Sequence, residues 1–105
     1  MTVEQILELI RCRIREAYAA PQLETPSQLD SSLFELHYLY AEATGQSDTW
    51  HRLRKEELAN VPAWHDRLRD SHGNFGSTVS TETAEVVTFW KGFSSTLGVE
   101  IEPPP

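Results

Sequence analysis

The sequence predicts an all-α protein: a compact bundle of four to five helices, with two long helices first, two short ones in the middle and one at the C-terminal end. Two observations predict this class. Apolar residues recur at helical spacing, and residues that start and stop helices flank these windows. With 105 residues, of which 39% are hydrophobic and 24% charged, the chain suits a single domain over residues 1–105 with a modest core.

The first long helix is predicted to begin after Thr2 and to end before Pro21. Thr2 and Gln5 have the spacing of a capping box, in which each side chain bonds the other residue's backbone N–H, and proline stops a helix. Leu9 does not fit its apolar face. That face, which we expect to be buried, comprises Val3, Ile6, Leu7, Ile10, Ile14, Ala17 and Tyr18.

The second long helix is predicted from Pro26 to about Thr44. Thr25 and Gln28 form another capping-box pair, Pro26 suits the first helical position, and Gly45 suits the residue past the end. A helix that is apolar on two sides is expected to be the central and most buried one. The two stripes lie on nearly opposite sides and comprise Leu29, Leu33, Leu36, Tyr40 and Ala43 on one, and Phe34, Tyr38 and Ala41 on the other.

The middle of the chain predicts two short helices. The first begins near Ser47 or Asp48, either of which suits an N-cap, and is interrupted before Pro62. The second covers about residues 61–72, and residues 71–77 are rich in turn formers and are expected to form a loop. The apolar faces comprise Trp50, Leu53, Leu58 and Val61 on the first, and Val61, Trp64 and Leu68 on the second.

The last helix is predicted to begin at a cap on Ser80 or Thr81 and to end at Gly98. Residues 99–105 are expected to lie as an extended tail on the bundle, because the three terminal prolines resist regular structure. The apolar face comprises Val86, Val87, Phe89, Trp90, Phe93 and Leu97. Trp90, like Leu36 of the second helix, is expected to be a core residue whose replacement by alanine removes about 2–5 kcal/mol of stability.

The chain is acidic, with 16 Asp and Glu against 9 Lys and Arg for a formal charge of −7. Residues 1–45 carry −4 and residues 76–105 carry −3, while residues 46–75 are balanced. Such a field attracts a protein with a basic surface and repels nucleic acid and anionic membranes. We therefore expect a basic protein partner, no direct contact with nucleic acid and no membrane association.

Cys12 is the only cysteine, so the chain has no internal disulfide. The N-terminus lacks a basic segment followed by an apolar one, and no window reaches the roughly 20 apolar residues that span a bilayer. These features predict a protein of the reducing cytoplasm.

No motif predicts catalysis, a metal or a cofactor. Asp70-Ser71-His72 has the residue types of a hydrolase triad, but consecutive side chains cannot form its chain of hydrogen bonds, and Gly73-Asn74-Phe75-Gly76 lacks the lysine of a phosphate loop. His37 lies between the two stripes of the second helix and is expected to be a buried neutral imidazole with a hydrogen-bond partner. The histidines without the close spacing of zinc ligands are His37, His51, His65 and His72. We therefore expect that the protein is not an enzyme.

The order of the elements and four short segments carry a family resemblance. The segments are Met1-Thr2 opening a long helix that closes at Pro21, Glu35-Leu36-His37-Tyr38-Leu39 in the second helix, His51-Arg52-Leu53 at the start of the next, and Leu97-Gly98-Val99-Glu100-Ile101 after the last. Together, over about two thirds of the chain, they resemble helical immunity proteins of bacterial type VI secretion toxins; residues 54–62 depart from the pattern. The resemblance implies stoichiometric inhibition of a cognate toxin inside the producing cell, and no contact residue is carried over from it.

Two other classes stay open beside toxin immunity. One is a phage-encoded inhibitor of a nucleic-acid-binding defence complex, an anti-CRISPR or other anti-defence protein, whose carboxylates stand in for phosphates. The other is a structural or adaptor subunit that forms a homodimer through exposed tryptophan helices. Rescue from a toxin encoded by the neighbouring gene favours immunity. Strong salt sensitivity and competition with DNA for a guide complex favour mimicry, and a concentration-dependent dimer without another ligand favours an adaptor.

We predict eight contact residues for the partner from charge and turn chemistry. They are Glu35 and Glu42 on the polar strip of the second helix, Asp48, Glu56 and Glu57 along the third segment, and Asp66, Asp70 and Phe75 beside the glycine loop. Loops carry contacts in many binding proteins, and carboxylates steer a basic partner toward the surface. Replacing Glu56 and Glu57 by lysine is therefore expected to slow association.

Overall fold

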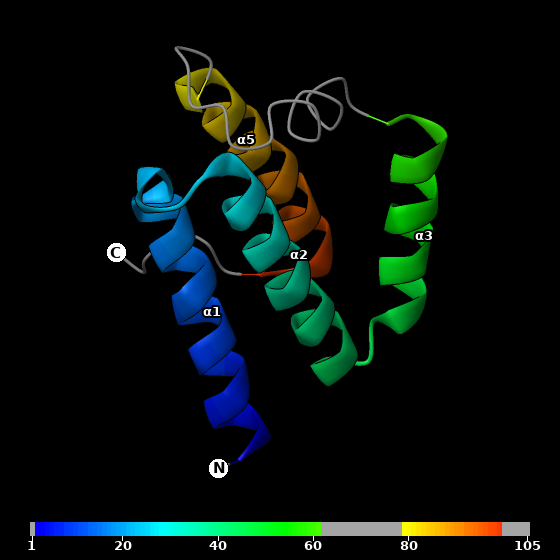
Figure 1. Cartoon of the computed structure of the whole chain (residues 1–105). Coiled ribbons are helices and arrows are strands. Elements are labelled where there is room, and N and C mark those ends of the chain that lie inside the picture. The colour runs from blue at the N-terminus through cyan, green and yellow to red at the C-terminus, as the bar shows by residue number, and fades with distance from the viewer. Residues whose placement is uncertain (1, 62–78, 100–105) are drawn as a thin grey trace.

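The computed structural model describes residues 2–61 and 79–99, with side chains over 2–61 and 83–99. In this part of the chain every regular element is a helix, so the all-α prediction is confirmed for these residues. The elements are α1 (Val3–Ala19), the 3-10 helix η1 (Pro21–Leu23), α2 (Pro26–Ala43), α3 (Ser47–Ala59) and α5 (Val79–Leu97) (Figure 1). The short helix predicted over 61–72, the loop over 71–77 and the tail beyond Val99 fall outside the described residues, apart from Val61.

The helices run alternately up and down, and α2 is the central one (Figure 1). It packs against α1, α3 and α5, and α5 also reaches η1. This arrangement confirms the prediction that the second helix is central. It also places α5 behind the α1 and α2 pair in the view of Figure 1, with the front of that pair turned outward.

The starts of α1 and α2 are capped as predicted. The Thr2 hydroxyl accepts a hydrogen bond from the Gln5 backbone N–H at 3.2 Å, and the Gln5 amide oxygen accepts one from the Thr2 backbone at 2.8 Å. Thr25 and Gln28 make the same reciprocal pair. The first backbone N–H groups of a helix have no partner within it, so each capping box satisfies two exposed donors.

Two predicted caps are wrong. α3 begins without a side-chain cap, because the Ser47 hydroxyl donates to the carboxylate of Glu42 on the preceding helix instead of bonding its own first turn. α5 already includes Ser80 and Thr81, so neither precedes that helix as its cap. The predicted end of the last helix is confirmed, since Gly98 directly follows α5. Its φ is 77°, a conformation that costs glycine little.

The core combines one face of each of the helices α1, α2, α3 and α5. Trp90 of α5 is 1% exposed and lies at its centre, with its ring stacked 6.4 Å from Trp50 of α3 and its indole N–H donating to Asp30 of α2 at 2.8 Å. The buried apolar residues are Leu7, Ile10, Ile14, Leu29, Leu33, Tyr40, Ala41, Trp50, Val86, Trp90, Phe93, Leu97 and Val99. The prediction that Trp90 is a core residue is confirmed.

Several apolar residues predicted to be buried are at least partly exposed. Leu36 is only half-buried, because it lies on the outward side of α2, away from α5. Ile6 and Val3 are exposed near the N-terminal end of α1, which projects past the other helices (Figure 1). The other exposed members of the predicted faces are Phe34, Tyr38, Ala43, Leu58 and Val61.

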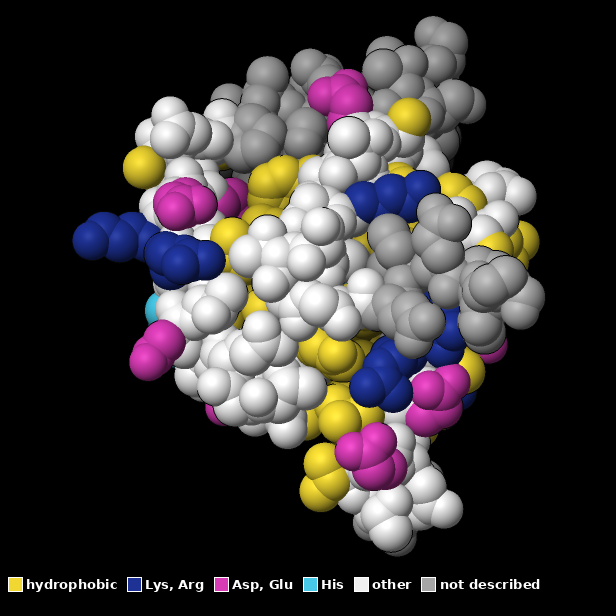
Figure 2. All heavy atoms as spheres, turned by 180° about the vertical axis from the view of Figure 1, so that it is seen from behind, with side chains coloured by type: hydrophobic (Ala, Val, Ile, Leu, Met, Phe, Trp, Pro, Cys, Tyr) yellow, Lys and Arg dark blue, Asp and Glu magenta, His cyan; other side chains and the backbone are white. Residues whose placement is uncertain are grey.

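Charged side chains of both signs are interspersed on the surface. Figure 2 shows the face behind that of Figure 1, where acidic and basic side chains of the described residues are intermixed. On α1, the Glu8 carboxylate pairs with Arg11 at 3.2 Å and with Arg15 at 2.9 Å. The hydrogen bond from Arg11 is the main reason that the pKa of Glu8 is lowered.

Among the described residues, no helix is both long enough and apolar enough to cross a membrane.

Replacing Trp90 by alanine is expected to lower the free energy of unfolding by about 3–5 kcal/mol, because it leaves a cavity between three helices and removes the donor to Asp30. Urea denaturation followed by circular dichroism measures the change. Leu58→Ala is the matched control, since Leu58 is 66% exposed and its loss should cost less than about 0.5 kcal/mol. Equal losses in the two variants would contradict the assignment of the core.

Candidate protein-binding surface

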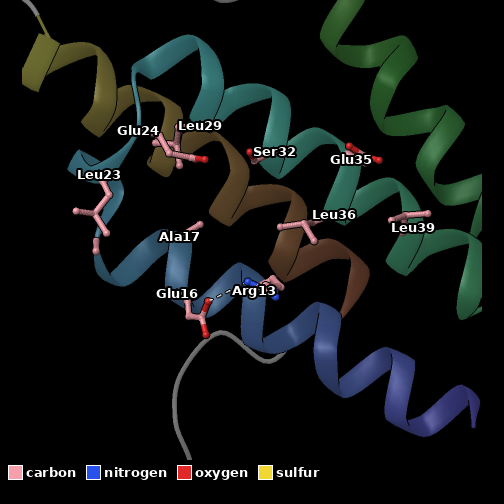
Figure 3. A pocket seen from close by; sticks show the side chains of 11 residues that line it. Arg13, Glu16, Ala17, Leu23, Glu24, Leu29, Ser32, Glu35, Leu36 and Leu39 are labelled. Atoms are coloured by element: carbon pink, nitrogen blue, oxygen red, sulfur yellow. Dashed lines mark ion pairs between the residues drawn. The ribbon is translucent and has the colours of Figure 1, made fainter. Parts of the chain in front are cut away.

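A hollow lies between α1 and α2, on the side of the helix pair that faces away from α5, and we call it the α1–α2 groove (Figure 3). Its volume is about 570 Å³, and η1 closes one end. The lining residues are Arg13, Glu16, Ala17 and Ala20 of α1 and its C-terminus, Leu23 and Glu24 at η1, and Leu29, Ser32, Glu35, Leu36 and Leu39 of α2.

Small side chains explain why this seam is hollow. Ala17 and Ala20 line it from the α1 side, and Ser32 lines it from α2. Tightly packed helices approach to 8–10 Å between axes, and the side chains at the contact fill the space between them. Here the alanines and the serine are too short to fill it, so Leu29, which is 1% exposed, forms part of the floor.

Exposed leucines continue this apolar surface along both helices. Leu23 is 81% exposed and Leu39 is 43% exposed. Leu9 and Ile6 are exposed on α1, one and two turns before Arg13 on the same side of that helix. Exposed apolar residues grouped beside a polar rim are typical of a protein-interaction site.

The rim of the groove is acidic. Three carboxylates, those of Glu16, Glu24 and Glu35, line it together with one cation, Arg13. The Arg13 guanidinium lies 3.9 Å from the Glu16 carboxylate, and both side chains are largely exposed, so this ion pair contributes little to stability. Three carboxylates against one guanidinium leave a formal charge of −2 on the groove lining.

Of the predicted contact residues that the structure describes, Glu35 is the one that lines the groove. Glu35 also borders a second hollow of about 410 Å³ with Asp30, Phe34 and Tyr38. Glu42 and Asp48 are exposed near the turn between α2 and α3, where Glu42 accepts the hydrogen bond from Ser47. Thus Glu42 and Asp48 lie outside the linings of both hollows.

Glu57 is buried, whereas a residue that contacts a partner was expected to be exposed. Glu56 is exposed on α3 as expected, but the Glu57 side chain is only 4% exposed and accepts a hydrogen bond from Arg54. A charged side chain is buried where a partner compensates it, and Arg54 lies one turn earlier on the same helix. The other predicted contact residues, Asp66, Asp70 and Phe75, lie outside the described residues.

Sequence reasoning missed the apolar part of the groove. Leu23, Leu36 and Leu39 were not expected at a binding site, and Leu36 was expected in the core. A signal was present, because Leu9 and Leu39 both fall outside the predicted buried stripes of their helices. An apolar residue off the buried stripe is often a chance surface residue, so the signal is weak without the neighbouring helix.

The second hollow is lined by aromatic rings that also support the core. Phe34 and Tyr38 each meet Trp50 edge to face, with ring centroids 5.2 and 5.7 Å apart. The Arg54 guanidinium lies 4.8 Å above the Phe34 ring, within the range of a cation–π contact. These contacts give Phe34 and Tyr38 a structural role despite their partial exposure.

A buried polar network lies inside the bundle and ties three helices together. His37 of α2 has no exposed surface, its Nδ1–H donates to the Leu33 carbonyl at 2.7 Å, and its Nε2 accepts from the Ser94 hydroxyl of α5 at 2.5 Å. The Tyr18 hydroxyl of α1 donates to the Ser94 oxygen at 2.8 Å. Every member therefore has a partner, as buried polar groups require.

Burial lowers the pKa of His37 to about 4, so the imidazole is neutral at pH 7. The prediction of a buried neutral histidine with a hydrogen-bond partner is confirmed. Burial also raises the pKa of the Tyr18 phenol. Because both His37 and Ser94 have no exposed surface, we assign the network to packing and helix register.

Acidification is expected to destabilise the fold through His37. Its pKa is about 4 in the folded chain and about 6.5 when unfolded, so the unfolded state binds more protons between these values. The contribution of His37 to the free energy of unfolding is fully present above pH 6.5 and is lost as the pH drops toward 4. Between pH 7 and pH 5 the loss from this residue is about 2 kcal/mol, measured by urea denaturation at both pH values.

His37→Gln should lose most of this pH dependence, whereas His51→Gln should keep it, because His51 is exposed on α3. A titration of the His37 ring by nuclear magnetic resonance gives an independent readout. A midpoint near pH 6.5 for that ring would show that its neutral form is not favoured by burial.

Within the described residues, no three His, Cys, Asp or Glu side chains are grouped as a metal site would need. No protein-family model matches the chain, and no curated protein or solved structure matches it either. The resemblance to immunity proteins therefore stays a prediction. The function of the α1–α2 groove is inferred below from its own residues.

Proposed function

We propose that this chain is a small acidic protein that binds a protein with a basic surface and inhibits it, as an immunity protein inhibits its cognate toxin. The observation that carries this proposal is the α1–α2 groove, which combines an apolar lining with an acidic rim on an outward face of the bundle. The formal charge of −7 supports a basic partner as well.

The two parts of the groove have different roles in binding. Leu23 and Leu39 provide affinity, because full burial of an exposed leucine is worth about 1.5–3 kcal/mol. Glu24 and Glu35 steer the partner toward the groove, because opposite charges raise the rate of encounter more than they raise affinity. A surface with both properties suits an inhibitor that forms its complex quickly and holds it.

Mimicry of a nucleic acid is less well supported. DNA carries one negative charge per about 1.7 Å of its axis, so a mimic needs many unpaired carboxylates close together. In the described residues Glu8, Glu16 and Glu57 pair with arginines on their own helices. A homodimer through the groove is also disfavoured, since a two-fold interface would set the acidic rim against its own copy.

Co-expression with each protein encoded by a neighbouring gene, as the candidate toxin, tests the proposal. We expect restored growth, a 1:1 complex in solution and loss of the toxin's activity when the purified chain is added. A chain that leaves the toxin active, and instead competes with DNA for a defence complex or forms only a homodimer, would contradict it.

The rim of the groove gives a sharper prediction about rates. Glu35→Lys is expected to slow association with the partner at least about threefold at low salt, because the reversed charge repels a basic surface at the groove. Glu56→Lys is the matched control: it reverses an exposed glutamate on α3, outside the groove lining, and should change the rate less. Stopped-flow fluorescence measures both, and an equal or larger effect of Glu56→Lys would place the contact on α3 instead.

A further inference from the structure

The outward sides of α1 and α2 carry matching stripes. On α1, Ile6, Leu9 and Arg13 follow each other at spacings of three and four residues. On α2, Leu36, Leu39 and Ala43 have the same spacings. Ile6, Leu9 and Leu39 are exposed apolar residues, and Arg13, Leu36 and Leu39 line the α1–α2 groove.

Alternating spacings of three and four residues are typical of a helix surface that packs along another helix. α1 and α2 already pack against each other, so stripes on their shared outward side are available to a third helix lying over the seam. The short Ala17 and Ser32 side chains leave room for knobs from that helix. An extended strand would instead seek backbone partners, and the backbone N–H and C=O groups of α1 and α2 bond within the helices.

We infer that the α1–α2 groove takes one amphipathic α-helix of the basic partner, with an apolar stripe against the seam and Lys or Arg along both flanks. This inference rests on the proposed function and names the part of the partner that is bound. α1 has 17 residues and α2 has 18, so a partner helix of about 14–18 residues matches their length.

Charge complementarity decides the occupant. Glu24 and Glu35 lie along the rim, together with Glu16 beside Arg13, where basic flanking residues of a bound helix would meet them. A second copy of this chain would bring its own acidic helices to the same rim, and like charges repel. A basic amphipathic helix satisfies both the apolar lining and the acidic rim.

Two synthetic peptides of 18 residues test the inference with the full chain. Both carry leucine at alternating spacings of three and four residues; one has lysine at the flanking positions, and the matched peptide has glutamate there. Fluorescence anisotropy of labelled peptides measures binding, and circular dichroism measures the helix content of the bound peptide. We expect the lysine peptide to bind as a helix, at least about tenfold more tightly than the glutamate peptide.

Substitutions in the chain locate the peptide. Leu39→Glu and Leu9→Glu are each expected to weaken binding of the lysine peptide at least about fivefold, because each places a charge on the apolar stripe. Leu58→Glu is the matched control, an exposed leucine on α3, and should leave the affinity unchanged. Thermal unfolding checks that each variant folds, and if Leu39→Glu does not fold, Leu9→Glu on the other helix decides.

Equal binding of the two peptides, a bound peptide that gains no helix, or equal effects of the variants at Leu39 and Leu58 would overturn the inference. The results that would contradict the proposed function differ from those that would contradict this inference. If the chain still inhibits a basic toxin while Leu39→Glu and Leu9→Glu leave that complex intact, the groove is not its contact and only this inference falls. If the lysine peptide binds in the groove but no basic protein is inhibited, the helix site stands and the proposed function falls.

Discussion

Trp90 of α5 packs against α2 and α3, and the rest of the structure depends on this interaction. Its ring stacks with Trp50, contacts Phe93 at 4.7 Å between centroids, and is fixed in direction by the hydrogen bond to Asp30. These contacts hold α5 against one side of α2. Because α5 occupies that side, the opposite side of the α1 and α2 pair is left facing outward, and the groove forms there (Figure 3).

The buried polar network fixes how α1, α2 and α5 are positioned along one another. Tyr18 of α1 and His37 of α2 meet at Ser94 of α5, and a hydrogen bond tolerates less sliding than an apolar contact does. The next residues in sequence, Ala17 beside Tyr18 and Leu36 beside His37, lie about 100° further around the same helices and line the groove. The network inside the bundle therefore fixes the relative position of the two walls outside it, and a well-placed surface binds with a smaller loss of conformational freedom.

Much of the fold could be predicted from local sequence, and most of the site could not. Both capping boxes, the buried face of α5 and the neutral His37 follow from spacing within one helix. The exposure of Leu36 does not follow from such spacing, because it depends on which side of α2 packs against α5. The burial of Glu57 does not follow either, because it depends on the tertiary packing around its salt bridge with Arg54. The groove itself arises from short side chains meeting across two helices, which no single helical pattern reveals.

The hollow seam has a further consequence for how such a chain can change. Larger side chains at Ala17 or Ala20 would fill the space between α1 and α2, and added packing in a small domain raises its resistance to unfolding. The same substitutions would close the groove that we propose as the binding site. Short residues at this seam therefore keep the groove open at the expense of packing between α1 and α2, and a variant selected only for thermal stability is expected to lose the groove.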